Sequence, residues 1–120
     1  MALTYSKQIL SGSTNGRMVE VNNLTSPGTT VHTVQATTTN GIEEVYLYAM
    51  NAGTATSPSR LTIELGGTGT ADHVIVDLAE MDGLNYLVPG VSFTATTSII
   101  RAFATASGIF HLAGWVNRAT

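Results

Sequence analysis

The residues of this chain that could carry chemistry are few and widely spread. His32, His73 and His111 each fall inside a segment with β-strand character, and no His-x-His spacing puts two of them on one strand face. A metal site would need these histidines to converge with a carboxylate, and their spacing does not favour that. We therefore expect packed or interfacial histidines, and neither a metal site nor a cofactor site.

The acidic residues and serines also lack the arrangement that catalysis needs. Glu43 and Glu44 are adjacent, so a strand would point them to opposite faces, and the solvated start of a strand is the better interpretation. Asp77 could form carboxylate pairs with Glu80 and Asp82, but Glu80 and Asp82 fit an exposed corner. No Gly-x-Ser-x-Gly elbow accompanies the serines. We expect no catalytic residues and a protein that is not an enzyme.

Composition excludes several classes of partner. The chain has 120 residues, no cysteine, 11% charged residues and a net charge of −3, so it has no basic surface for a phosphate backbone. No apolar run approaches the roughly 20 residues of a membrane helix, and Met1 to Leu10 lacks the order of a signal peptide. We expect a protein made in the cytoplasm that binds neither nucleic acid nor membrane. Its few charges indicate a surface that contacts other protein.

The clearest structural signal runs from Glu43 to Gly67. Apolar residues fill nearly every position from Glu44 to Met50, and they alternate with polar ones from Leu61 to Leu65. The linker between them is made of small residues and residues that break regular structure, so the pattern predicts a β-hairpin with one wet and one buried face.

Similar patterns recur along the chain. In the segment Asp72 to Leu78 the core face would carry Val74, Val76 and Leu78, and Ala79 to Leu84 could hold one helical turn. Further strands are expected at Lys7–Leu10, Arg17–Val21, Thr30–Ala36, Asn85–Val88, Val91–Ala95, Ile99–Thr105 and Ile109–Asn117, the last two joined as a second hairpin.

This pattern of short strands defines the expected fold class. About eight to ten strands with frequent turn signals and no useful helical periodicity predict an all-β protein, a single antiparallel β-sandwich that is jelly-roll-like. A barrel is the main alternative, because periodicity does not separate the two. We expect residues 1–120 to form one domain, in which residues 1–10 could be an extended N-terminal arm.

Aromatic and arginine side chains mark the expected interface. Tyr46, Tyr48 and Met50 share one strand face, which either lines a contact between subunits or forms a platform for sugars. Arg101 sits in an apolar strand and needs a carboxylate such as Glu44 or Glu64 unless it lies exposed on a wet face. We favour the subunit contact, and the residues expected in it are Tyr46, Tyr48, Met50, Arg101, Trp115 and Arg118.

The order of segments EEVYLYAMNAGTA, LTIELGGT, ADHVIVDL, GLNYLVPG, SIIRAFA and HLAGWVNR resembles a group of small tailed-bacteriophage virion proteins. In that group an acidic pair leads into V-x-L-Y-A-x-N, and the chain ends near N-R. The resemblance covers about Glu43 to Arg118. It implies β-sandwich accessory components that often sit as trimers on capsids, or small tail and fibre-base parts.

From this resemblance we expect a structural virion protein. It would be a capsid decoration or cement protein that binds the outer capsid surface and stabilises joints between major capsid subunits. Its partners would be the major capsid protein and further copies of itself in a homotrimer, with the N-terminal arm pairing with a neighbour's sheet edge. The alternative is a tail or fibre-base protein that contacts the host surface, including a carbohydrate-binding version.

Overall fold

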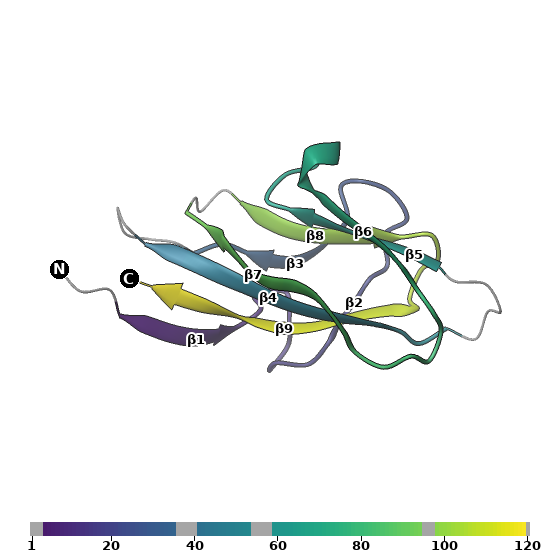
Figure 1. Ribbon diagram of the computed structural model, residues 1–120, viewed down its shortest axis with the longest axis horizontal. Helices are drawn as coiled ribbons and strands as arrows, with labels where there is room; N and C mark the ends of the chain where they lie inside the picture. Colours follow the sequence, from purple (N-terminus) through teal and green to yellow (C-terminus); the bar gives the residue numbers. More distant parts are fainter. Residues whose placement is uncertain (1–3, 36–40, 54–58, 95–97, 120) are drawn as a thin grey trace.

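The computed structural model describes residues 4–35, 41–53, 59–94 and 98–119. Two antiparallel sheets pack face to face, which confirms the predicted all-β sandwich (Figure 1). The five-stranded sheet holds β1 (Tyr5–Ile9), β2 (Val19–Glu20), β4 (Ile42–Asn51), β7 (Asn85–Phe93) and β9 (Phe110–Ala119). The four-stranded sheet holds β3 (Thr29–Thr33), β5 (Ser59–Leu65), β6 (His73–Leu78) and β8 (Ile99–Ala104), and a short 3-10 turn, η1 (Thr70–Asp72), precedes β6.

The strand order is β1-β9-β4-β7 in one sheet, with β2 also paired to β9, and β3-β8-β5-β6 in the other. The chain therefore crosses from one sheet to the other at most of its connections. Among the described strands from β2 onward, β5 and β6 are the consecutive pair that lies side by side.

Alternating apolar residues build the core between the sheets. In β4 the odd-numbered residues point inward and are fully or almost fully buried, while the even-numbered ones lie on the outer face. Val74 and Val76 pack against the core and Leu78 is buried, which confirms the predicted core face of that strand. Central buried side chains are Val45, Leu47, Leu61, Ile63, Ile100, Phe110, Leu112 and Val116.

Both predicted hairpins are wrong. The strands β4 and β5 lie in opposite sheets, as do β8 and β9. Each strand of such a pair has its own apolar face, and placing the two in facing sheets buries both faces against each other across the core. Side-by-side pairing would leave the two apolar faces on the same side of one sheet.

Two local predictions are also wrong. Asn85 to Phe93 is one strand that runs through Pro89 and Gly90, because β7 is an edge strand in which a proline removes no ladder hydrogen bond and a glycine with φ +87° fits a bulge. Residues 79–84 form an irregular loop in place of a helical turn, and Met81 there has φ +56°.

The first described strand, β1, belongs to the five-stranded sheet of the same chain. Residues Tyr5 to Ile9 pair with β9 from Ala119 back to Trp115, and the following Leu10 is 1% exposed. The described part of the expected arm is therefore held within the domain. Residues 1–3 of that arm and the predicted strand ends at Ala36 and Ala95 lie outside the described residues. No helix in the described part of the chain is long and apolar enough to cross a membrane.

Candidate binding face

The outer face of the five-stranded sheet carries a row of stacked aromatic rings. Strand register places Trp115 of β9 opposite Tyr46 and Tyr86 of β7 opposite Tyr48. The ring centroids of Tyr46 and Trp115 lie 4.9 Å apart with an interplanar angle of 9°, and those of Tyr48 and Tyr86 lie 4.6 Å apart at 19°. Tyr48 also stacks on Trp115 at 6.1 Å. We call these four residues the aromatic stack.

The flat faces of most of these rings are covered within the protein. The amine Nζ of Lys7 lies 4.5 Å from the Trp115 ring centroid, and it approaches from β1, on the side of β9 away from Tyr46. Gly90 lies against the other face of Tyr46, because a Cβ atom on this glycine would come within 3.1 Å of the ring. The stack thus presents ring edges to solvent, whereas Tyr86 at its end is 51% exposed.

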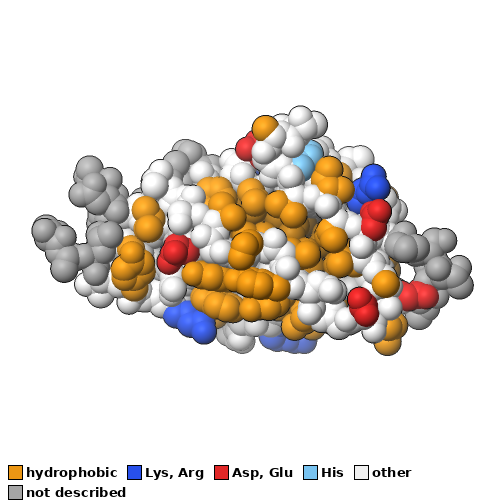
Figure 2. Space-filling view, viewed as in Figure 1, with side chains coloured by type: hydrophobic (Ala, Val, Ile, Leu, Met, Phe, Trp, Pro, Cys, Tyr) orange, Lys and Arg blue, Asp and Glu red, His pale blue; other side chains and the backbone are white. Residues whose placement is uncertain are grey.

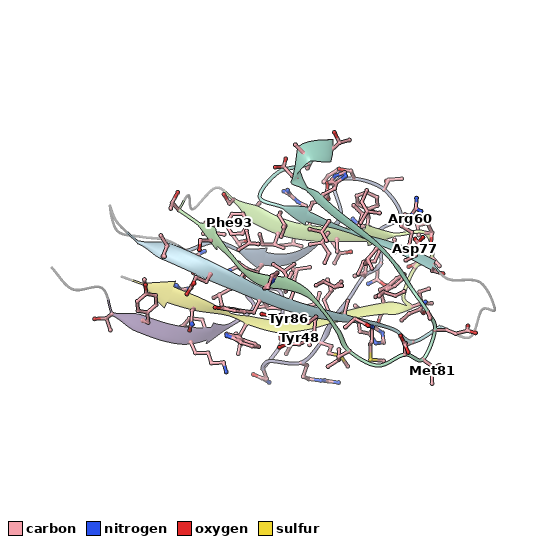
Figure 3. The ribbon with its side chains drawn as sticks, viewed as in Figure 1. Tyr48, Arg60, Asp77, Met81, Tyr86 and Phe93 are labelled. Carbon is pink, nitrogen blue, oxygen red and sulfur yellow. The ribbon has the colours of Figure 1, made fainter. Side chains whose placement is uncertain are left out.

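The surroundings of the Tyr86 hydroxyl shift its pKa upward. Partial burial, and after it the neighbouring Tyr48 and Tyr46, raise the pKa of Tyr86 above its ordinary value of 10.0. At neutral pH this hydroxyl is therefore a hydrogen-bond donor and acceptor without charge. Figure 3 shows the Tyr48 and Tyr86 side chains next to each other, on the front of the molecule in this view.

Other apolar side chains extend the same outer face. Tyr5 and Ile9 of β1 lie opposite Ala119 and Trp115 and are 56% and 54% exposed. Met50, expected at the interface, follows Tyr48 on this face and is half-buried. Sequence reasoning placed Tyr46 and Tyr48 together but missed Tyr86 and Lys7, because only the register between distant strands brings these two beside the tyrosines and the tryptophan.

Arg118 is not part of this face. It lies opposite Glu43 on the inner side of the sheet, and its Nε donates to Oε2 of Glu43 at 2.6 Å. The second carboxylate oxygen, Oε1, is 2.6 Å from Nε2 of His32, which comes from the facing sheet. The Nδ1 atom of His32 accepts the backbone N–H of Ser11, so the ring's proton is on Nε2 and is donated to Glu43.

The environment of Glu43 corrects the expectation that it is solvated. Glu43 is fully buried. Burial acts to raise the pKa of Glu43, but hydrogen bonds from His32, Arg118 and a backbone N–H outweigh it and bring the pKa below its ordinary value of 4.5. The carboxylate is therefore charged at neutral pH and links the two sheets. The alternation of residues in β4 places Glu43 on the same inward face as Val45. This alternation was the feature of the sequence that could have predicted the burial of Glu43.

Of the two settings expected for Arg101, a carboxylate partner or an exposed wet face, the structure does not bear out the first. It lies opposite Glu64 in β5, but Glu64 accepts hydrogen bonds from the hydroxyl of Ser26 at 2.6 Å and the backbone N–H of Gly28 at 2.7 Å. Glu44 is on the outer face of the other sheet. Arg101 forms an ion pair with neither acid, and the buried Glu64 instead fastens the loop that precedes β3 over the four-stranded sheet.

An open groove of about 560 Å³ lies where the segment between β1 and β3 meets β9. Arg17, Glu20 and His111 contribute its charged or titratable side chains. Among the described residues, no three His, Asp or Glu side chains are placed to hold a metal ion.

Comparison with known proteins gave no relative. No protein-family model matches the chain, and no curated protein or solved structure matches it either. The function must therefore be argued from the binding face itself.

Proposed function

We propose that this chain is a structural protein that binds other protein subunits through the aromatic stack, and that it acts as a capsid decoration protein on the outer surface of a phage capsid. The partner on this proposal is the major capsid protein. The observation that carries it is the row of four stacked rings, Tyr46, Tyr48, Tyr86 and Trp115, on the outer face of the five-stranded sheet.

A row of this kind suits a protein partner. Tyrosine and tryptophan bury large areas at a small cost in side-chain entropy and keep a polar group for hydrogen bonds at the rim, so they are enriched in protein interfaces. Because these rings are already stacked on each other, their positions are fixed before a partner arrives, which lowers the entropy lost on binding.

The strand order supports the same proposal at the level of fold. The chain alternates between the sheets β1-β9-β4-β7 and β3-β8-β5-β6. We interpret this order as jelly-roll-like, and jelly rolls are used by viral capsid and lectin domains. Fold alone does not define function, so this is analogy. The resemblance of residues 43–118 to small tailed-phage virion proteins points in the same direction.

The second candidate is a tail or fibre-base protein that binds a sugar on the host surface. The half-exposed Tyr86 at the end of the stack favours it, because a sugar ring packs on a free aromatic face. The other rings have their faces covered by each other, by Gly90 or by Lys7. A protein surface can use ring edges and a sugar needs ring faces, so we favour the capsid partner.

The proposal is tested by co-sedimentation with expanded capsids of the phage that encodes this chain, prepared without the protein. Tyr86→Ala should lower the affinity about tenfold, the effect of losing a contact worth about 1.4 kcal/mol. Leu24→Ala is the matched control, because Leu24 is also exposed (56%) but lies away from the aromatic stack, and it should bind like wild type. Equal binding of Tyr86→Ala and wild type would contradict the proposal.

A glycan array separates the two candidates. Binding to one class of glycan that disappears in Tyr86→Ala, with no binding to capsids, would support the sugar-binding alternative in place of the decoration protein.

A further inference from the structure

Among the described strands, β6 forms an edge of the four-stranded sheet and has a neighbour, β5, on one side only. It pairs with β5 over six consecutive residues, from Glu64 opposite His73 to Ser59 opposite Leu78, with no shift in register. An edge of this kind offers a straight row of free backbone N–H and C=O groups to another strand.

The other edges carry features that discourage pairing. The edge strand β7 has two register shifts and contains Pro89, and β3 has a register shift between Thr30 and His32. The strand β1 carries Lys7 at its centre, and lysine is a residue that natural sheets use to protect an edge. Among the described strands, β6 is thus the edge best suited to a partner.

Apolar side chains lie beside this edge. The strands β6 and β7 run along the same side of the sandwich (Figure 1), and Figure 2 shows hydrophobic side chains gathered over the centre of that side. Ile75 of β6 is 58% exposed. The partly buried residues that pack against the core from these strands and β5 are Leu65, Val74, Val76, Leu87 and Phe93.

The sequence of β6, HVIVDL, is complementary to itself in one antiparallel register. A twofold axis perpendicular to a sheet brings the outer face of one copy next to the outer face of the other. Odd-numbered residues of β6 can therefore lie opposite only odd-numbered residues of the partner strand, and even-numbered residues opposite only even-numbered ones. An axis through Ile75 puts Ile75 opposite the partner's Ile75 and His73 opposite the partner's Asp77. Moving the axis to Val76 would instead put Ile75 opposite the partner's Asp77. Both the pairing of Ile75 with Ile75 and that of His73 with Asp77 would then be lost.

We propose that two copies of this chain form a symmetric dimer in which β6 pairs with β6 of the second copy. The two four-stranded sheets then become one continuous sheet. Ile75 packs on the twofold axis and Val74 faces the partner's Val76. Each Asp77, 2.9 Å from its own Arg60, lies opposite the partner's His73, whose Nε2 is 3.6 Å from Glu64 of its own chain. A symmetric contact of this type closes on itself, so it forms dimers and not the trimers that the resemblance implies.

Light scattering on the full chain during size-exclusion chromatography tests the dimer. We expect twice the mass of one chain for the wild type and the mass of one chain for Ile75→Lys, which places two like charges on the axis. Met81→Lys is the control, because Met81 is 73% exposed but lies in the loop after β6, and it should stay dimeric. A monomeric or trimeric wild type, or a dimeric Ile75→Lys, would overturn the proposal.

A cysteine tests the register without depending on a charge. The chain contains no cysteine, so a single introduced thiol reports only its own contacts. Residues directly opposite in antiparallel strands have Cβ atoms about 4.5–5.5 Å apart, and Ile75→Cys should therefore form a disulfide-linked dimer under mild oxidation. Leu24→Cys, with nearly the same exposure, should stay unlinked. Equal linking of the two variants would contradict this register.

Discussion

Glu43 and Arg118 lie directly opposite each other in β4 and β9, and the Arg118 Nε donates to the buried Glu43 carboxylate at 2.6 Å. His32 reaches the other oxygen of this carboxylate from the facing sheet. One acid thus joins three strands, β3, β4 and β9, at one end of the core. The stability of this end depends on charge and hydrogen bonds as well as on apolar packing.

Removing Arg118 should destabilise the protein strongly. Arg118→Met keeps an unbranched side chain but leaves the Glu43 charge buried with one partner fewer, and loss of one member of a buried pair lowers the free energy of unfolding by about 3 kcal/mol. Urea unfolding measures this change. The matched control is Arg17→Met, which removes an exposed arginine that lies outside this network and next to β2, in the other sheet from β6, and it should have no measurable effect. Equal losses in the two variants would contradict the buried network.

The same network predicts loss of stability in acid. The pKa of Glu43 is lower in the folded protein than its ordinary value of 4.5, so the unfolded chain takes up the proton first as pH falls. The contribution of Glu43 is complete above that ordinary value and disappears as pH falls through the folded-state pKa. Urea unfolding from about pH 7 to about pH 3 should show a steeper decline for wild type than for Glu43→Gln.

Arg60 also lowers the pKa of Asp77, through a hydrogen bond that outweighs slight burial, and that pair likewise weakens in acid. Because both proteins contain it, its effect cancels in the comparison. Parallel stability curves for wild type and Glu43→Gln would show that Glu43 does not titrate as expected.

Glu64 should control the loop that precedes β3. Glu64→Ala removes the acceptor of the buried Gly28 N–H and of the Ser26 hydroxyl, and an unsatisfied buried donor costs about 2 kcal/mol. Ser26→Ala removes one of these bonds and should cost about 1 kcal/mol. Hydrogen exchange should show faster exchange of the Gly28 amide in Glu64→Ala than in Ser26→Ala. Slow exchange of this amide in both variants would mean that other contacts hold the loop.

Substitutions at two glycines can distinguish the cost of backbone strain from the cost of displacing a ring of the aromatic stack. Gly83 and Gly90 both have positive φ, +77° and +87°, but a Cβ atom on Gly83 meets nothing within 4 Å. Gly83→Ala should therefore cost about 1 kcal/mol from the left-handed backbone alone. Gly90→Ala must also displace the Tyr46 ring and should cost about 1–2 kcal/mol more. Thermal and urea unfolding of the two variants measure the difference, and equal costs would show that Tyr46 does not rest on Gly90.

Local patterns in the sequence predicted the features that depend on residues close together in the chain, namely the strands and their buried faces. The alternation in β4 and β6 predicted the strands and their buried faces, because a period of two places apolar residues on one side whatever the partner strand is. The partner strands were not predictable in this way. The expected hairpins failed because β4 and β5 face each other across the core, a relation that neither strand's own pattern encodes.

In the candidate binding face, too, contacts within one strand were predictable from the sequence and contacts between distant strands were not. Tyr46 and Tyr48 belong to one strand, so their common face was predicted from spacing. Tyr86 and Lys7 come from strands paired at a distance and were missed. Glu43 was interpreted as solvated because an isolated acid is usually exposed. Its charge is stabilised in the core only because His32 and Arg118, from other strands, both donate hydrogen bonds to its carboxylate.

Trp115 is the chain's single tryptophan, and its indole lies in the middle of the proposed binding face, parallel to Tyr46 and beneath Lys7. Its fluorescence therefore comes from one known place. A partner that covers this face removes water from that indole and shifts its emission, whereas pairing along β6 occurs on the other sheet and leaves the indole in its present surroundings. The unlabelled protein can thus distinguish optically between its two proposed contacts.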